Sequence, residues 1–276
     1  MDLGALAAKV TAEIMRKFFS AKSLGILLSV TLLAPLVPVG FWLFANRWPF
    51  QSAFPTIYGW HGLQIFRQIG GISALLSSLE ISFCVALIVL PIAISAVFYL
   101  GRDRSRPHPI VEILLFSPVF IPPFALVMGV SVASIILRIP EFLATVLTLA
   151  TLALPYSVYV LRAAYRNYDS RWDDTGRVLG LNSLRMMIRV RLPILIKPIS
   201  AAGLMALLVG WGDYIVTVIV GGSRVNSLPI LLASMATSAG NDSAVSVVVA
   251  VGIVVPIAIL LAIKSAFNLG KRVPKQ

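Results

Sequence analysis

The chain has 276 residues, of which 58% are hydrophobic and only 12% are charged. Soluble domains usually carry about 25% charged residues, so this composition excludes an ordinary soluble protein. The net charge of +12 does not indicate nucleic-acid binding, because the basic residues fall in short stretches between long apolar runs. The sequence predicts an all-α protein that crosses a membrane several times.

The apolar runs predict one transmembrane domain over residues 23–270. Residues 1–22 precede it, with apolar side chains every three or four positions among four Lys/Arg, which is typical of an amphipathic cytoplasmic helix. The alternative for this segment is a disordered basic tail. A short cytoplasmic tail, residues 271–276, ends the chain. The six expected spans are residues 24–46, 75–99, 110–137, 142–164, 198–221 and 245–266.

The distribution of basic residues predicts the orientation. With six spans and both termini inside, 19 of the 23 Lys/Arg lie on the cytoplasmic side. The four on the outer side are Arg47, Arg67, Arg138 and Arg224. Cytoplasmic loops retain positive charge, so this asymmetry favours a multi-pass protein with cytoplasmic termini.

Residues 166–198, between spans 4 and 5, are the most informative stretch. Eight Lys/Arg lie between Arg162 and Lys197. Each Arg near a bilayer centre costs about 2.5–3.5 kcal/mol on insertion scales, so the stretch is predicted to be a cytoplasmic loop.

This loop has the signals of two short helices. Asp173 and Asp174 suit the first turn of a helix, and Gly180 can end that helix in a left-handed conformation. Asn182 or Ser183 can cap a second helix over residues 184–191. The Leu192-Pro193 pair is expected to end it, because the residue before proline avoids the α region.

The loop resembles the cytoplasmic loop of permease subunits of binding-protein-dependent ABC importers. That family's pattern is Glu-Ala-Ala, three residues, Gly, about nine residues, then Ile-x-Leu-Pro. Asp replaces Glu here and Thr-Gly replaces Ala-Ala, while the bend glycine and the Leu-Pro pair are kept. Stretches over about residues 72–268 are similar too, among them SPVFIPPFALVMG and GWGDYIVTVIVGG, the second like the polyamine, ferric-iron, thiamine and phosphonate branch.

The resemblance implies the type I importer permease fold, with a coupling helix that docks on an ATPase subunit. It implies two ATP-binding subunits, a second homologous or identical permease and a periplasmic or lipid-anchored solute-binding protein, at a bacterial inner membrane. No P-loop occurs in the sequence, so ATP and Mg²⁺ are expected on the partner, with no cofactor and no enzymatic activity in this chain. The expected coupling residues are Asp173, Asp174, Thr175, Gly176, Gly180, Leu181, Asn182, Leu192 and Pro193.

A carboxylate inside span 5, Asp213, is the sharpest candidate for the translocation path. Intramembrane carboxylates face the bundle interior or a water-filled path, and Trp211 and Tyr214 beside it can offer aromatic faces to a cation. Glu80 in span 2 is a second candidate. A structural contact is the alternative role for both acids. Two acids favour a cationic solute such as a polyamine or thiamine. No metal site is expected.

Two other classes of protein remain open. A proton-coupled secondary carrier usually has internal repeats, and none is evident between residues 1–138 and 139–276. A polytopic membrane enzyme needs a catalytic cluster, and the Asp173-Asp174 pair lacks a second acidic cluster to hold magnesium. The prolines of span 3 and Pro155 in span 4 are expected to kink their helices.

Overall fold

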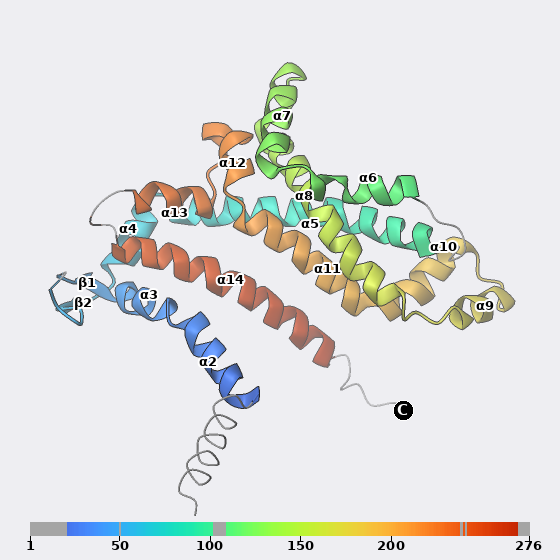
Figure 1. Ribbon diagram of the computed structural model, residues 1–276, viewed down its shortest axis with the longest axis horizontal. Helices are drawn as coiled ribbons and strands as arrows, with labels where there is room; N and C mark the ends of the chain where they lie inside the picture. The colour runs from blue at the N-terminus through green and yellow to red at the C-terminus, as the bar shows by residue number, and fades with distance from the viewer. Residues whose placement is uncertain (1–20, 50, 102–108, 238–239, 241, 270–276) are drawn as a thin grey trace, which may run out of the picture. The chain divides into compact units, whose positions relative to one another are not determined.

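The computed structural model describes residues 21–49, 51–101, 109–237, 240 and 242–269 (Figure 1). The expected amphipathic segment, apart from its last two residues, and the expected tail lie outside these residues. The chain divides into two units, one from Met1–Phe66 with Ala239–Ala250 and one from Arg67–Ser238 with Val251–Gln276. Each unit is described by itself.

The first unit holds the first expected span, which is a bent pair of helices. α2 (Ala21–Leu33) and α3 (Leu36–Leu43) meet at 44°, with Pro35 directly before α3. A small antiparallel hairpin follows, β1 (Ala45–Arg47) with β2 (Ile57–Tyr58), and it is an exception to the all-α expectation. α4 (His61–Gln68) comes next, and its Gly62 lies against the carbonyl of Ser243 at the start of α14 (Asp242–Leu269).

The aromatic residues of this unit pack on one another. The Phe41 ring lies 6.1 Å from the Trp48 ring and 5.7 Å from the Phe54 ring, both edge to face. Phe44 and Trp60 pair in the same way at 5.1 Å. These pairs join the end of α3 to the segment between β1 and α4.

Three long helices form the core of the second unit: α5 (Gly71–Gly101), α8 (Glu141–Tyr165) and α11 (Leu192–Gly212) (Figure 1). Small residues let their backbones approach, as is usual between membrane helices. A Cβ on Gly210 of α11 would lie 2.9 Å from the Cα of Ser82 on α5. The buried Ser157 hydroxyl of α8 donates to the Ala202 carbonyl of α11 at 3.0 Å.

The third expected span is not one continuous helix. It consists of α6 (Pro109–Phe120) and α7 (Pro123–Ile136), which meet at 100°. Two consecutive prolines cause the break, because Pro122 and Pro123 each disfavour the α region in the residue before them. Pro122 itself is extended, with ψ 125°. The single Pro118 stays inside α6.

The loop predicted to be cytoplasmic forms α9 (Arg171–Val178), α10 (Ser183–Met186) and a π-helical segment, Met187–Arg191, that runs directly into α11. The prediction that Leu192-Pro193 ends the second helix is therefore wrong. The wider π turn lets the Leu192 N–H donate to the Met187 carbonyl five residues back, so the helix passes the proline without stopping.

The fifth expected span also ends earlier than predicted. α11 ends at Gly212, and Asp213 is extended rather than helical. α12 (Ile215–Ile219), a 3₁₀ turn (Gly222–Arg224) and α13 (Leu228–Ala236) follow before α14. Asp213 thus lies at a helix break and not inside a continuous span.

Four helical stretches are long and apolar enough to cross a membrane: Gly71–Gly101, Glu141–Tyr165, Ser183–Gly212 and Asp242–Asn268. Within the described residues the number rises to six if the bent pairs α2–α3 and α6–α7 each count as one span. The predicted all-α, multi-span class is confirmed.

Candidate functional site

The bend between α9 and α10 forms as the sequence predicts. Gly180 has φ +75°, its N–H donates to the Arg177 carbonyl at 2.9 Å, and the Leu181 N–H donates to the Gly176 carbonyl at 3.0 Å. This pair of bonds is the Schellman motif that a left-handed glycine allows at a helix C-terminus. Asn182 caps α10, since its Oδ1 accepts from the Arg185 N–H at 2.9 Å.

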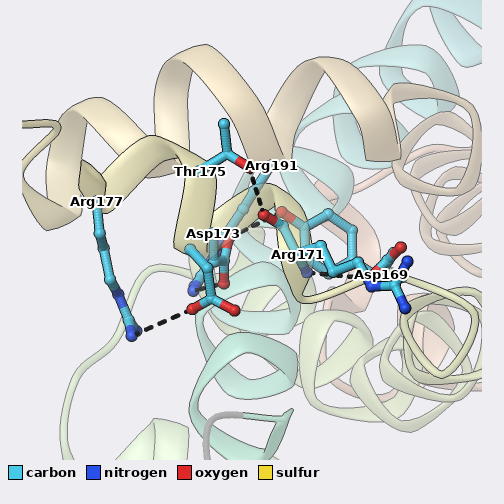
Figure 2. Close-up of polar contacts among 8 residues, drawn as sticks. Asp169, Arg171, Asp173, Thr175, Arg177 and Arg191 are labelled. Atoms are coloured by element: carbon cyan, nitrogen blue, oxygen red, sulfur yellow. Dashed lines mark hydrogen bonds and ion pairs between the residues drawn. The ribbon is translucent and has the colours of Figure 1, made fainter. Parts of the chain in front are cut away.

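Asp173 fixes α9 to the rest of the loop through three hydrogen bonds (Figure 2). The Arg191 guanidinium donates from Nε to Oδ1 at 3.1 Å and from Nη2 to Oδ2 at 2.5 Å. The Tyr168 hydroxyl donates to Oδ1 at 2.8 Å. Such bidentate, charge-assisted pairs are among the strongest hydrogen bonds in proteins. We call Tyr168, Asp173 and Arg191 the loop clamp.

The ionisation states match this geometry. Burial works against the charged form of Asp173, but the hydrogen bonds from Arg191 and Tyr168 outweigh it and hold the pKa of this carboxyl below its ordinary value. Burial, and then the bonded carboxylate, raise the pKa of the Tyr168 hydroxyl. At neutral pH the clamp therefore joins a carboxylate to a guanidinium and a protonated phenol.

An aromatic stack connects the loop clamp to the long helices. The Tyr168 ring stacks on Tyr165 at the end of α8, with centroids 5.3 Å apart. The Arg191 guanidinium lies over the Phe98 ring of α5, 5.2 Å from its centroid, which is a cation–π contact. A Cβ on Gly101 would collide with the Tyr165 ring. The loop is thus anchored to the ends of both α5 and α8.

Gly176 and Asp174, two of the motif positions, differ in their surroundings. Gly176 is buried against Met186 of α10, whose Sδ would lie 2.8 Å from a Cβ at this position. Asp174 is exposed and makes a 3.7 Å ion pair with Arg177. A cavity of about 290 Å³ lies beside the clamp, between α9, α10 and the end of α5.

The bend also presents apolar side chains to its surroundings. Val178 and Leu179, directly before Gly180, are 88% and 73% exposed. Large apolar side chains exposed to this degree beside charged residues often mark an interaction site. We call this set the coupling face, and it consists of Trp172, Val178, Leu179, Leu184 and Ile188, all more than half exposed.

The four expected path residues differ in their surroundings. The half-buried Asp213 carboxylate accepts from the Thr217 N–H at 3.0 Å and from its hydroxyl at 3.2 Å, so it caps the start of α12. Trp211 is buried, and its indole N–H donates to the Gly252 carbonyl at 3.0 Å. Tyr214 is 42% exposed, and Glu80 is exposed on α5.

A buried serine on α5 connects this helix to the start of α13. The Ser78 hydroxyl of α5 accepts from the Leu228 N–H at 2.8 Å, which satisfies one of the free donors at the start of α13. This contact joins residues 150 positions apart, so no local sequence pattern indicates it. Glu112, in the first turn of α6, pairs with Arg162 near the end of α8, whose guanidinium donates to it at 2.6 Å.

A core of long apolar helices, with a polar loop anchored to the ends of two of them, defines an integral-membrane protein. The family described as "Binding-protein-dependent transport system inner membrane component" matches residues 94–273, and the chain belongs to it. It is a transporter permease and not an enzyme.

Individual relatives agree with this family. The chain is 25% identical over 232 residues to the putative 2-aminoethylphosphonate transport system permease protein PhnU of Salmonella typhi, covering 74% of this chain and 79% of PhnU. It is 22% identical over 203 residues to the inner membrane ABC transporter permease protein YcjP of Escherichia coli, covering 69% of each. The fold matches a bacterial ABC transporter that imports the acidic polysaccharide alginate, at TM-score 0.61 and 15% identity, covering 97% of this chain and all of that one.

Proposed function

We propose that this chain forms the translocation path of an ATP-driven importer and is moved by a separate ATPase subunit that grips the coupling face. The observation that carries the proposal is the combination of the loop clamp with that face. A coupling loop must expose a surface to the partner and be attached rigidly to the helices that it moves. The Asp173–Arg191 ion pair provides the rigid attachment, and Val178 and Leu179 provide the exposed surface.

The expected coupling residues take different roles in this proposal. Asp173 anchors the loop, and Gly176 lets α9 lie close to Met186. Gly180 and Asn182 shape the bend, while Leu192 and Pro193 carry the movement into α11 through the π-helical turn. The exposed Asp174 and Thr175 complete the surface next to the partner, and the partly buried Leu181 packs beside Gly176.

The partners follow from the family. Two ATP-binding subunits, a second permease and a solute-binding protein complete the importer in this proposal, at a bacterial inner membrane with both termini of this chain inside. ATP closes the two ATPase subunits and draws the coupling loops together, which opens the path outward to accept solute. Hydrolysis reverses the movement.

Introducing negative charge on the coupling face tests the docking. Val178→Asp with Leu179→Asp places two carboxylates on the most exposed apolar positions of the loop. The variant is expected to lose co-purification with the ATPase subunit and solute uptake, and to keep its thermal stability. Ile57→Asp is the control, since Ile57 is 50% exposed on β2, in the segment expected on the outer side. Retained co-purification in the double variant would overturn the proposal and reopen the secondary-carrier and membrane-enzyme alternatives.

For the solute, we propose a small cation such as a polyamine or thiamine, with Asp213 and Glu80 in or near the path. The support is that Glu80 lies on α5 and Asp213 at the break directly after α11, and that Tyr214 beside Asp213 is partly exposed. Asp213→Asn keeps acceptor atoms for the Thr217 cap but removes the charge. The proposal expects a rise of KM for a cationic solute at unchanged protein level. An unchanged KM for Asp213→Asn and for Glu80→Gln would exclude it.

A further inference from the structure

A groove between α11 and α14 combines apolar walls with two lysines. It holds about 340 Å³ and lies entirely within the second unit. Leu204, Leu260 and Phe267 supply hydrocarbon and aromatic surface, and Lys197 and Lys264 contribute the two positive charges. The proposed coupling function assigns no role to this groove.

The two helices are antiparallel here, which locates the lysines along the span. The Trp211 indole of α11 donates to the Gly252 carbonyl of α14. Lys197 lies 14 residues before Trp211, and Lys264 lies 12 residues after Gly252. At 1.5 Å per residue both are therefore about 20 Å from that hydrogen bond, toward the end of α11 that continues into the cytoplasmic loop. Long lysine side chains at this depth extend toward the lipid head groups.

The two helices that form the groove contribute no acidic side chain to it. Residues 192–212 and 243–269, which include both walls, contain no Asp or Glu. Lys197 and Lys264 are both exposed. Two lysines beside apolar walls complement a ligand with an anionic head and hydrocarbon chains. Asn268, also on the lining, carries two further N–H donors.

We infer that this groove binds one anionic phospholipid from the leaflet next to the coupling loop. The lysines pair with the phosphate of the head group, and an acyl chain lies along Leu204 and Leu260. Basic pockets between membrane helices bind anionic head groups in this way. A lipid here fills the space between α11, which carries the coupling movement, and α14. The inference goes beyond the proposed function and does not depend on the solute.

Native mass spectrometry of the full chain in detergent tests the inference, with dioleoyl-phosphatidylglycerol titrated against dioleoyl-phosphatidylcholine. The wild type is expected to bind phosphatidylglycerol more tightly. A lysine near an anionic head group contributes about fivefold in affinity, so Lys197→Gln with Lys264→Gln is expected to weaken binding about 25-fold, to the phosphatidylcholine level. Lys197→Arg with Lys264→Arg is expected to retain tight binding.

Three controls separate the groove from general electrostatics. Arg185→Gln with Arg189→Gln removes the same charge from exposed positions outside the groove and is expected to change binding less than twofold. Ala201→Trp fills the groove at constant charge and is expected to abolish the preference. Inorganic phosphate at 10 mM is expected not to displace the lipid. Equal losses in both Gln pairs, tight binding by Ala201→Trp, or displacement by phosphate would each overturn the inference.

Discussion

Replacing Asp173 by Asn is expected to loosen α9 while leaving the transmembrane core folded. The Asp173 and Arg191 side chains are 11% and 22% exposed, so the pair lies between a surface ion pair and a fully buried one. Surface pairs contribute about 0–1 kcal/mol, and removing one partner of a buried pair costs about 3–5 kcal/mol. Asn keeps an acceptor for the Tyr168 hydroxyl, which limits the loss. We therefore expect about 2–3 kcal/mol less local stability, which corresponds to about 30- to 150-fold faster opening.

Hydrogen–deuterium exchange of the peptide over residues 171–178 measures this opening. Asp174→Asn is the matched control, because Asp174 is 70% exposed and its ion pair with Arg177 is 3.7 Å long. It is expected to change the exchange rate by less than about twofold. A double-mutant cycle with Arg191→Gln is expected to give a coupling energy of at least about 1 kcal/mol. Equal exchange in the two Asn variants, or a coupling energy near zero, would refute the loop clamp.

Three further predictions concern pH and helix packing. Because the pKa of Asp173 is lowered in the folded protein, its contribution is present above the unfolded pKa of about 4 and is lost as pH falls through the folded value; the protection of the α9 amides, relative to their intrinsic exchange rate at each pH, should fall in acid in the wild type and should not in Asp173→Asn. Gly210→Ala is expected to lower the free energy of unfolding by about 1–3 kcal/mol, because its Cβ would lie 2.9 Å from the α5 backbone. A Cβ at Gly212 meets no atom within 4 Å, so Gly212→Ala is expected to leave the free energy of unfolding unchanged. Ser78→Ala leaves the buried Leu228 N–H without its acceptor and is expected to cost about 1–3 kcal/mol, measured by thermal unfolding; no loss would show that this contact does not hold α13.

The local features of the cytoplasmic loop were predictable because each depends on a few neighbouring residues. A glycine after a short helix with acids in its first turn indicates a left-handed end, and Gly180 has φ +75°. Asn182 before a helical pattern indicates an N-cap, and its side chain accepts from the Arg185 N–H at the start of α10. The family pattern added the coupling role, which no local rule supplies.

The loop clamp was not predictable in the same way. Asp173 and Arg191 are 18 residues apart, and eight Lys/Arg in this stretch were equally plausible partners. The choice depends on how the bend at Gly180 brings α9 back beside the π-helical segment. The sequence offered one weak signal. Asp173 and Gly176 are three residues apart, so they share one face of α9, and a glycine that packs inward would turn Asp173 away from solvent as well.

The prolines show most clearly what limits prediction from this sequence. Single prolines stay inside long helices at Pro91, Pro155 and Pro198, where a lost hydrogen bond is tolerable because neighbouring helices pack around the site. The helix also continues through Pro193, because the preceding π turn displaces the backbone carbonyl that the proline ring would otherwise meet. The pair Pro122-Pro123 differs because it excludes two successive residues from the α region, and no single lengthened turn absorbs both. A proline therefore indicates where a membrane helix is weak, and the backbone on either side decides whether it bends, adjusts or breaks.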